Sequence, residues 1–89
     1  MSYRTKILES AQQEIKALPG YVRAHAYQLL DQLQHNPRPP RAKELRDKPG
    51  IYRIWLAGRW RIVYHVDDDL QQIYILRVRR KERVDYESL

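Results

Sequence analysis

The sequence predicts an α+β fold in which a helical hairpin packs on one face of a small, largely antiparallel sheet. Two observations support this prediction. Apolar residues recur at helical spacing in the N-terminal half, and three runs of alternating character follow in the C-terminal half. The expected order of elements is strand, helix, helix, strand, strand, strand. A chain of 89 residues has room for one modest core, so we expect a single domain over residues 1–89.

The N-terminal elements are expected to be a short strand and a short helix. Residues 3–8 form a β-branched and aromatic run, which predicts the strand. Ser10 and Gln13 have the spacing of a capping box, which marks the start of the helix. The helix should last about two turns, until the Pro19-Gly20 break, and its apolar residues are Ala11, Ile15 and Leu18.

A second helix follows closely and completes the hairpin. It presents one apolar stripe, formed by Val22, Ala26, Leu29, Leu30 and Leu33. The proline-rich segment 36–40 ends this helix, because proline lacks an amide proton and restricts the residue before it. Residues 41–50 are polar and basic, and we interpret them as a loop that crosses the surface, with Leu45 as its apolar anchor.

Three strands are expected over residues 51–56, 60–66 and 73–78, joined by turns at 57–59 and 67–69. Alternate side chains of a strand point to opposite faces of the sheet. One face is apolar and should pack under the helices: Tyr52, Ile54, Leu56, Trp60, Ile62, Tyr64, Val66, Tyr74, Leu76 and Val78. The other face collects the cations: Ile51, Arg53, Trp55, Arg59, Arg61, Val63, His65, Ile73, Ile75, Arg77 and Arg79, with Lys81 next in phase.

The composition favours a polyanionic partner. The net charge is +6, and twelve of the seventeen cations are arginine, whose planar fork grips phosphate in a bidentate manner. The absence of cysteine excludes disulfides, thiolate nucleophiles and cysteine-bound metals. The N-terminus is polar, and no apolar run approaches the ~20 residues needed to span a bilayer, so we expect no membrane contact and a cytoplasmic location.

The cationic face predicts contact with single-stranded RNA. A tryptophan lies among its arginines, and residues 79–83 and Tyr86 extend the basic surface past the last strand. This combination supplies phosphate contacts together with rings on which bases stack, at about 1–3 kcal/mol per base. The residues expected to bind RNA are Lys48, Trp55, Arg59, His65, Arg77, Arg79, Arg80 and Arg83.

Three residues of this surface also have structural interpretations. Arg61 lies mid-strand among apolar residues, where a buried cation needs an anionic partner, so it could form a structural salt bridge. Tyr86 could pack on the sheet edge as a C-terminal plug. His65 carries an imidazole, a side chain that suits acid–base catalysis, but a histidine near a strand end also serves structural roles.

Four motifs resemble the RelE/ParE superfamily of bacterial toxins. They are Leu45-Arg46, Pro49-Gly50-Ile51-Tyr52-Arg53-Ile54, Arg59-Trp60-Arg61-Ile62-Val63-Tyr64 and Lys81-Glu82-Arg83. The resemblance covers nearly the whole chain, and its specificity comes from the order and spacing of the motifs together. It implies a type II toxin–antitoxin module, in which an acidic antitoxin from a neighbouring gene wraps the toxin in a hetero-oligomer.

The resemblance implies two established activities for one fold. RelE-type members enter the ribosomal A site and cleave mRNA by attack of a 2′-hydroxyl on the adjacent phosphate, without metal or other cofactor. The ribosome and mRNA are then the partners, and the implied catalytic residues are Arg53, Arg61, Lys81 and Tyr86. Arg53 and Arg61 would stabilise the pentacovalent phosphate, and Tyr86 would orient or stack a base. ParE-type members inhibit DNA gyrase instead, and a non-catalytic nucleic-acid-binding module is the third hypothesis.

Two positions depart from the RelE pattern. Arginine replaces lysine at Arg53, and Trp55 stands where the pattern has a second basic residue. A guanidinium loses its proton far less readily than an amine, so the candidates for general base are Lys81, His65 or a proton relay through ribosomal RNA. These departures favour gyrase inhibition, whereas Tyr86 and the context of Arg61 favour mRNA cleavage.

Overall fold

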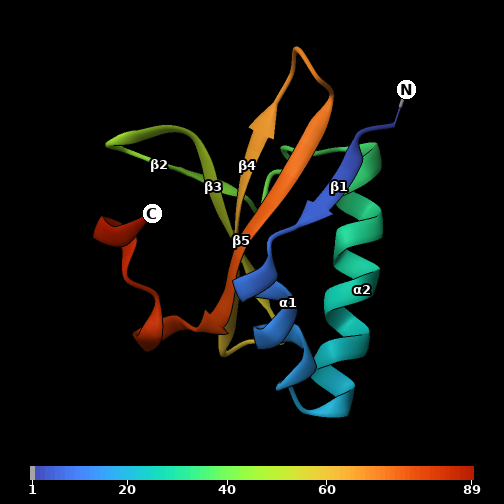
Figure 1. Ribbon diagram of the computed structural model, residues 1–89, viewed down its shortest axis with the longest axis vertical. Coiled ribbons are helices and arrows are strands. Elements are labelled where there is room, and N and C mark those ends of the chain that lie inside the picture. The colour runs from blue at the N-terminus through green and yellow to red at the C-terminus, as the bar shows by residue number, and fades with distance from the viewer. Residues whose placement is uncertain (1) are drawn as a thin grey trace.

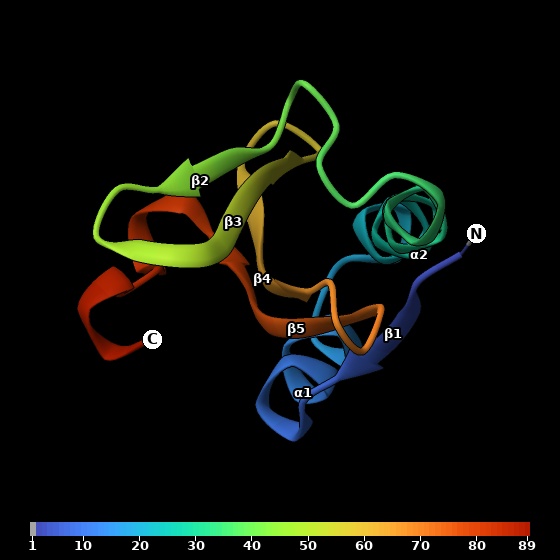
Figure 2. The ribbon, with the colours of Figure 1, turned by 90° about the horizontal axis from the view of Figure 1, so that it is seen from above.

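The computed structural model describes residues 2–89 as a five-stranded mixed sheet with two helices on one face (Figure 1). The strand order is β1-β5-β4-β3-β2, with β1 parallel to β5 and all other neighbours antiparallel. From above, the helices and the C-terminal segment lie on opposite sides of the sheet (Figure 2). The predicted α+β class and helical hairpin are confirmed. The elements are β1 (Arg4–Ile7), α1 (Glu9–Lys16), α2 (Gly20–His35), β2 (Lys43–Leu45), β3 (Lys48–Leu56), β4 (Trp60–Asp67), β5 (Gln72–Arg80), η1 (Lys81–Arg83) and η2 (Tyr86–Ser88).

Both helices form where the apolar spacing predicts them. The five residues of the α2 stripe are all buried. Helix α1 begins at Glu9 without a side-chain cap, and Ser10 lies inside its first turn, so the predicted capping box is wrong. The Ser10 hydroxyl oxygen instead accepts a hydrogen bond from Arg77 Nη1 at 2.6 Å. No helix within residues 2–89 is long and apolar enough to cross a membrane.

The segment predicted as a surface loop contains an edge strand. Strand β2 pairs antiparallel with β3, which begins earlier than the sequence predicted, at Lys48. Gly50 sits in this hairpin with a φ of 84°, and a Cβ there would lie 3.1 Å from the His65 ring, so both backbone and space require glycine. Lys43 and Glu44 of β2 are both exposed, and a strand with so little burial shows no apolar alternation in its sequence.

The alternation of β5 changes phase at a β-bulge. The register with β4 slips by one residue, which leaves Leu76 as an extra residue in β5. Ile73 and Ile75 consequently face the helices and are fully buried, whereas Tyr74 stacks on His65 at the opposite face with ring centroids 6.0 Å apart. The sequence alternation assigned residues 73–75 to the opposite faces, and that part of the prediction is wrong.

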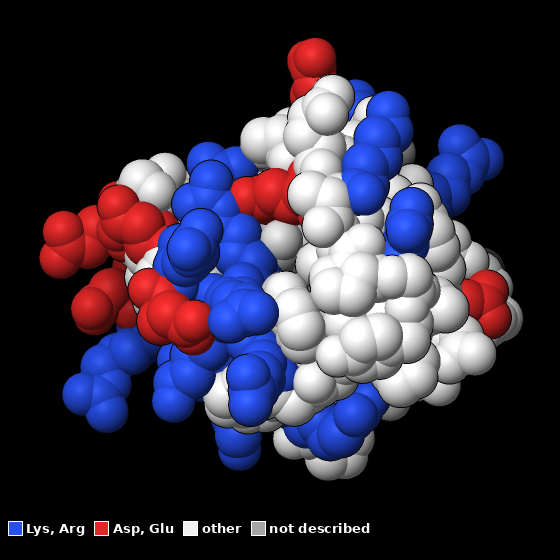
Figure 3. All heavy atoms as spheres, turned by 90° about the horizontal axis from the view of Figure 1, so that it is seen from below, with Lys and Arg blue, Asp and Glu red and all other residues white. Residues whose placement is uncertain are grey.

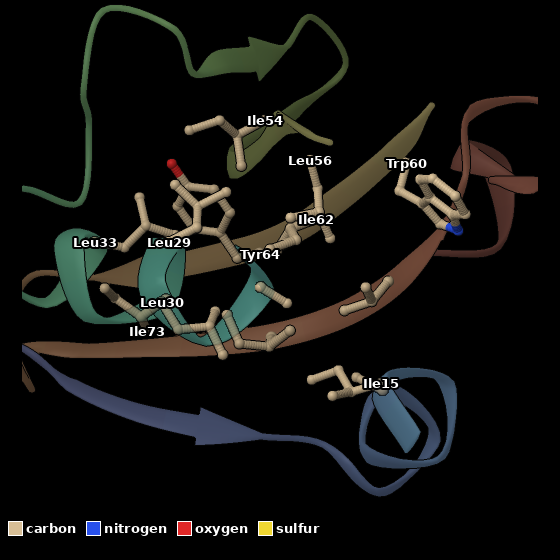
Figure 4. Packing of buried hydrophobic residues seen from close by; sticks show 14 of the residues in the cluster. Ile15, Leu29, Leu30, Leu33, Ile54, Leu56, Trp60, Ile62, Tyr64 and Ile73 are labelled. Atoms are coloured by element: carbon tan, nitrogen blue, oxygen red, sulfur yellow. The ribbon is translucent and has the colours of Figure 1, made fainter. Parts of the chain in front are cut away.

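The core lies between the sheet and the helices (Figure 4). Tyr64 is fully buried there, and its hydroxyl donates a hydrogen bond to the backbone oxygen of Pro37 at 2.8 Å. Burial raises the pKa of the Tyr64 phenol above its usual value. Trp60 is buried in the same core, whereas Trp55 is exposed on the other side of the sheet, as the alternation predicts. The packed face fixes β3, β4 and β5, so their opposite face is a rigid platform.

An exposed ion pair ties the β4–β5 turn to the proline-rich segment. Arg38 makes a bidentate contact with Asp68, at 3.0 and 2.8 Å, and also donates to the Tyr52 hydroxyl. The hydrogen bonds from Arg38, and then that from Tyr3, hold the pKa of the Asp68 carboxyl below its usual value. A lowered carboxyl pKa stabilises the folded state above the unfolded pKa, and this contribution is lost as pH falls through the folded pKa.

We therefore expect Asp68→Asn to lower the melting temperature slightly at neutral pH and to converge with the wild type in acid. Thermal melts at pH 7 and across the acid range measure this difference. Asp69→Asn, which changes the neighbouring exposed carboxylate, is the matched control and should show no such convergence. A gap between Asp68→Asn and the wild type that stays constant into acid would contradict the ion-pair assignment.

Candidate nucleic-acid interface

The sheet face opposite the helices carries the predicted cations. Strands β3, β4 and β5 lie side by side there, so that Trp55 pairs with Arg61 and Arg61 with Arg79 in the register. Lys and Arg side chains gather on the side of the molecule that carries the C-terminal segment, with Asp and Glu at the outer edge of this group and a few among the cations (Figure 3). A surface on which cations predominate creates a local positive field that attracts anionic partners.

Arg61 is a buried cation without a carboxylate partner. Arg61 is only 9% exposed, and it is the only charged residue among the buried residues of the described chain. Its Nη1 donates to the Tyr86 hydroxyl at 2.6 Å, whereas both ion pairs found within residues 2–89 involve other arginines. Burying a cation is costly unless an anion compensates it. The structural salt bridge considered for Arg61 is therefore absent from the described residues.

Tyr86 joins Arg61 to Arg53. The Tyr86 ring lies 5.8 Å from the Arg53 guanidinium carbon, and its hydroxyl accepts the bond from Arg61. Helix η2 holds Tyr86 in place, because the Asp85 carboxylate accepts a hydrogen bond from the Glu87 amide at 3.0 Å. Tyr86 is thus packed on the sheet, as the plug interpretation predicts, and it also contacts two cations of the predicted site.

The Trp55 ring contacts both Arg61 and Lys81. Its ring centroid is 4.5 Å from the Arg61 guanidinium carbon and 5.6 Å from Lys81 Nζ, both within the range of cation–π attraction. Trp55 is 42% exposed, so part of its indole remains open to a ligand. Contacts through Tyr86 and Trp55 therefore join the four predicted catalytic residues into one group, called here the cation–aromatic cluster: Arg53, Tyr86, Arg61, Trp55 and Lys81.

Several predicted RNA-binding residues flank this cluster. Arg59 and Arg80 line a shallow pocket together with Trp55 and Lys81, and Arg80 also covers the Trp60 ring at 5.3 Å. Arg83 is exposed just beyond β5. Lys48 donates to the backbone oxygen of Leu89 at 3.2 Å, so it contacts the C-terminal segment.

Other predicted residues point away from the cluster. Arg77 donates to the Ser10 hydroxyl, and Arg79 forms an ion pair with Glu14, so both reach helix α1. His65 is bonded through Nδ1 to the Gly50 backbone oxygen at 3.1 Å. Along β4 it lies four residues from Arg61, about 13 Å at the usual rise per residue. The structural interpretation of His65 therefore agrees with its contacts.

Two residues of the interface escaped the sequence analysis. Arg41 and Lys43 line a recess together with Arg53, Trp55 and Arg61. Lys43 is the register partner of Arg53 across the β2–β3 pair, which places it beside the cluster. The sequence shows that segment 41–50 is basic, but it predicts a loop there. A loop has no strand register from which the position of each cation could be predicted.

Solved structures of bacterial toxins share this fold. A double mutant of the E. coli toxin RelE in the free state has a TM-score of 0.85 at 28% identity, covering 99% of this chain and 93% of that one. The isolated E. coli RelE toxin has a TM-score of 0.81 at 30% identity, covering 98% and 93%. A chain of the intact E. coli RelBE toxin–antitoxin complex has a TM-score of 0.82 at 29% identity, covering 92% and 100%.

The fold and these relatives define the class of protein as a toxin of a type II toxin–antitoxin system. Residues 6–85 match the family model described as "ParE toxin of type II toxin-antitoxin system, parDE". The chain therefore belongs to the RelE/ParE family of toxins, which confirms the predicted family. No curated protein sequence matches the chain.

Proposed function

We propose that this toxin is a ribosome-dependent endoribonuclease that cleaves mRNA at the cation–aromatic cluster. The observation that carries the proposal is Arg61, a buried guanidinium with a phenol and an indole as neighbours and no carboxylate within the described residues. A scissile phosphate is the anion that would compensate this charge. RNA also supplies bases that can stack on the exposed part of Trp55.

The reaction is a transfer within the RNA chain. The 2′-hydroxyl loses its proton and attacks the adjacent phosphorus, the bond to the 5′-oxygen breaks, and that oxygen takes up a proton. The products are a 2′,3′-cyclic phosphate and a 5′-hydroxyl. Negative charge develops on the phosphate oxygens in the transition state, where Arg61 and Arg53 stabilise it by preorganised electrostatics. Tyr86 holds Arg61 in position through its hydroxyl, 2.6 Å from Nη1.

Proton transfer is assigned to Lys81 rather than His65. Lys81 lies beside the Trp55 ring, and its amine is the only lysine nitrogen of the cluster. An amine exchanges its proton far more readily than the guanidinium of Arg53 or Arg61. In this scheme Lys81 protonates the departing 5′-oxygen, and the attacking hydroxyl loses its proton to a group of the ribosome.

Gyrase inhibition is the second candidate, favoured by two specific observations. The matching family model is the one described as a ParE toxin. Trp55 presents an uncharged, exposed ring within the cluster, and exposed tryptophan is a frequent anchor of protein–protein contacts. In this alternative the surrounding cations bind a protein or DNA surface and no RNA bond is broken.

The proposed partner outside the reaction is an acidic antitoxin. The support is the net charge of +6 together with the RelB-bound state of the E. coli relative. An antitoxin that covers the cation–aromatic cluster would silence the toxin by excluding its target, and neutral or basic chains would gain less from the same surface.

Two parallel assays separate the candidate functions. Purified toxin is added to a reconstituted translation reaction, where primer extension maps mRNA ends, and to a gyrase supercoiling reaction. We expect new mRNA ends in the ribosomal A site and undisturbed supercoiling. Intact mRNA together with inhibited supercoiling would contradict the nuclease proposal and support gyrase inhibition.

A further inference from the structure

We infer that Arg41 and Lys43 form a second phosphate-binding subsite, which holds a neighbouring nucleotide of the single-stranded RNA whose cleavage is proposed above. The subsite is the recess between β2 and β3 lined by Arg41, Lys43, Arg53, Ile54, Trp55 and Arg61. It shares Arg53 and Arg61 with the cation–aromatic cluster and adds Lys43 of β2 and Arg41, which lies just before β2. This inference rests on the proposed function for the identity of the RNA, but the binding it predicts is measurable without cleavage.

The position of Lys43 follows from the sheet register. Lys43 pairs with Arg53 across the antiparallel β2–β3 ladder, so the two side chains emerge on the same face of the sheet. Arg41 precedes it by two residues and lines the same recess. Edge strand β2 and the turn before it therefore bring two cations to the side of the cluster where β3 carries the uncharged Trp55.

The charges in this recess are uncompensated. Four of its six lining residues are cations, and none is acidic. Arg41 and Lys43 are exposed, and neither side chain takes part in a hydrogen bond or ion pair found within residues 2–89. Two other arginines of the described residues are neutralised by carboxylates, in the Arg38–Asp68 and Arg79–Glu14 pairs. Like charges this close repel one another, and binding of an anion relieves the repulsion.

The shape of the recess favours a nucleotide over an isolated phosphate. Trp55 forms one wall, and a base stacked on its exposed part leaves the attached phosphate near the cations. The recess also continues into the cluster through Arg53 and Arg61, so successive phosphates of one strand can occupy the two sites. Single-stranded RNA meets both requirements.

The test measures how the affinity for RNA depends on salt. A fluorescent RNA oligonucleotide with 2′-O-methyl groups throughout cannot be cleaved, and its anisotropy reports binding by the full-length toxin over a range of NaCl concentrations. The variants are Lys43→Gln, Arg41→Gln and the double variant, which keep much of the side-chain length. Lys6→Gln is the matched control, because Lys6 is an exposed lysine on β1, the opposite edge strand.

For single strands each phosphate contact contributes about 0.7 to the slope of log affinity against log salt. We expect each single variant to lose about 0.7 of the slope and the double variant about 1.4, with Lys6→Gln like the wild type. Lys43→Arg keeps the charge and should restore the slope. Melting temperatures should be unchanged, because both side chains are exposed.

Three outcomes would overturn the subsite: wild-type slopes in both variants, an equal loss in Lys6→Gln, or no binding of the oligonucleotide by the wild type at low salt. Failure of the proposed function looks different. If the variants lose salt dependence but the toxin leaves mRNA on ribosomes intact, the subsite is supported and the nuclease function is contradicted. If the toxin cleaves mRNA normally but the variants keep the wild-type slope, the nuclease function is supported and the subsite is contradicted.

Discussion

Replacing Arg61 with alanine is expected to reduce mRNA cleavage on programmed ribosomes by about 10²–10³-fold, which is the usual cost of removing one preorganised donor from a transition state, about 2.7–4 kcal/mol. The reason is its position, because Arg61 lies buried beneath Tyr86 and Trp55 and carries a charge that no described residue neutralises. Single-turnover cleavage of mRNA with excess toxin measures the effect on the chemical step without product release.

Two further variants make the Arg61 result specific. Arg61→Lys keeps the charge but loses the planar fork that reaches both the phosphate and the Tyr86 hydroxyl, so it should recover only part of the rate. Arg4→Ala removes an exposed arginine from β1, at the far edge of the sheet from β2, and should cleave like the wild type. If Arg61→Ala cleaves mRNA at the wild-type rate, the proposed catalytic role of this cluster is contradicted.

Replacing Tyr64 with alanine is expected to lower the free energy of unfolding by about 3–5 kcal/mol, as for other large aromatic residues deleted from a core. Tyr64 is fully buried, stacks on Tyr52 with ring centroids 5.7 Å apart, and donates to the Pro37 backbone oxygen. Since small domains are stable by only about 5–15 kcal/mol, this loss takes a large share of the total. Urea denaturation followed by circular dichroism measures it.

The separate contributions of the ring and the hydroxyl can be distinguished. Tyr64→Phe keeps the ring and leaves the Pro37 oxygen without its donor, which should cost about 1–3 kcal/mol. Tyr27→Ala removes a tyrosine ring that is mostly exposed on α2 and should cost far less. If Tyr64→Ala unfolds no more easily than Tyr27→Ala, the described core is incorrect.

The fold was predictable wherever burial leaves a periodic trace. The α2 stripe and the alternation of β3 and β4 identified the faces that pack between the helices and the sheet. The same alternation correctly placed Trp60 in the core and Trp55 on the opposite, exposed face. Strand β2 is too exposed to leave such a trace, so it read as a loop. The bulge at Leu76 shifts the phase of β5 by one residue, and nothing in the alternation itself signals a bulge.

The cluster was predictable because strand alternation and the family resemblance converge on the same side chains. Arg53, Arg61, Lys81 and Tyr86 were predicted to form one site, and in the structure Trp55 connects Lys81 to Arg61 while Tyr86 connects Arg61 to Arg53. Alternation alone does not say which cations are neutralised by residues far along the chain. Two residues of helix α1 contact arginines of β5: Glu14 forms an ion pair with Arg79, and Ser10 accepts a hydrogen bond from Arg77. These contacts exist only in the folded chain. The recess that Arg41 and Lys43 line likewise depends on the register of β2, which exists only in the folded chain.

The most direct test of nuclease function uses an mRNA in which a single A-site nucleotide lacks its 2′-hydroxyl. Purified toxin is incubated with ribosomes programmed with this mRNA or with its all-ribose counterpart, and the ends of the products are mapped. We expect the all-ribose message to be cut in the A site, leaving a 2′,3′-cyclic phosphate, and the bond next to the deoxynucleotide to remain intact. Equal cutting of both messages would contradict 2′-hydroxyl attack, and no cutting of either would contradict the nuclease itself.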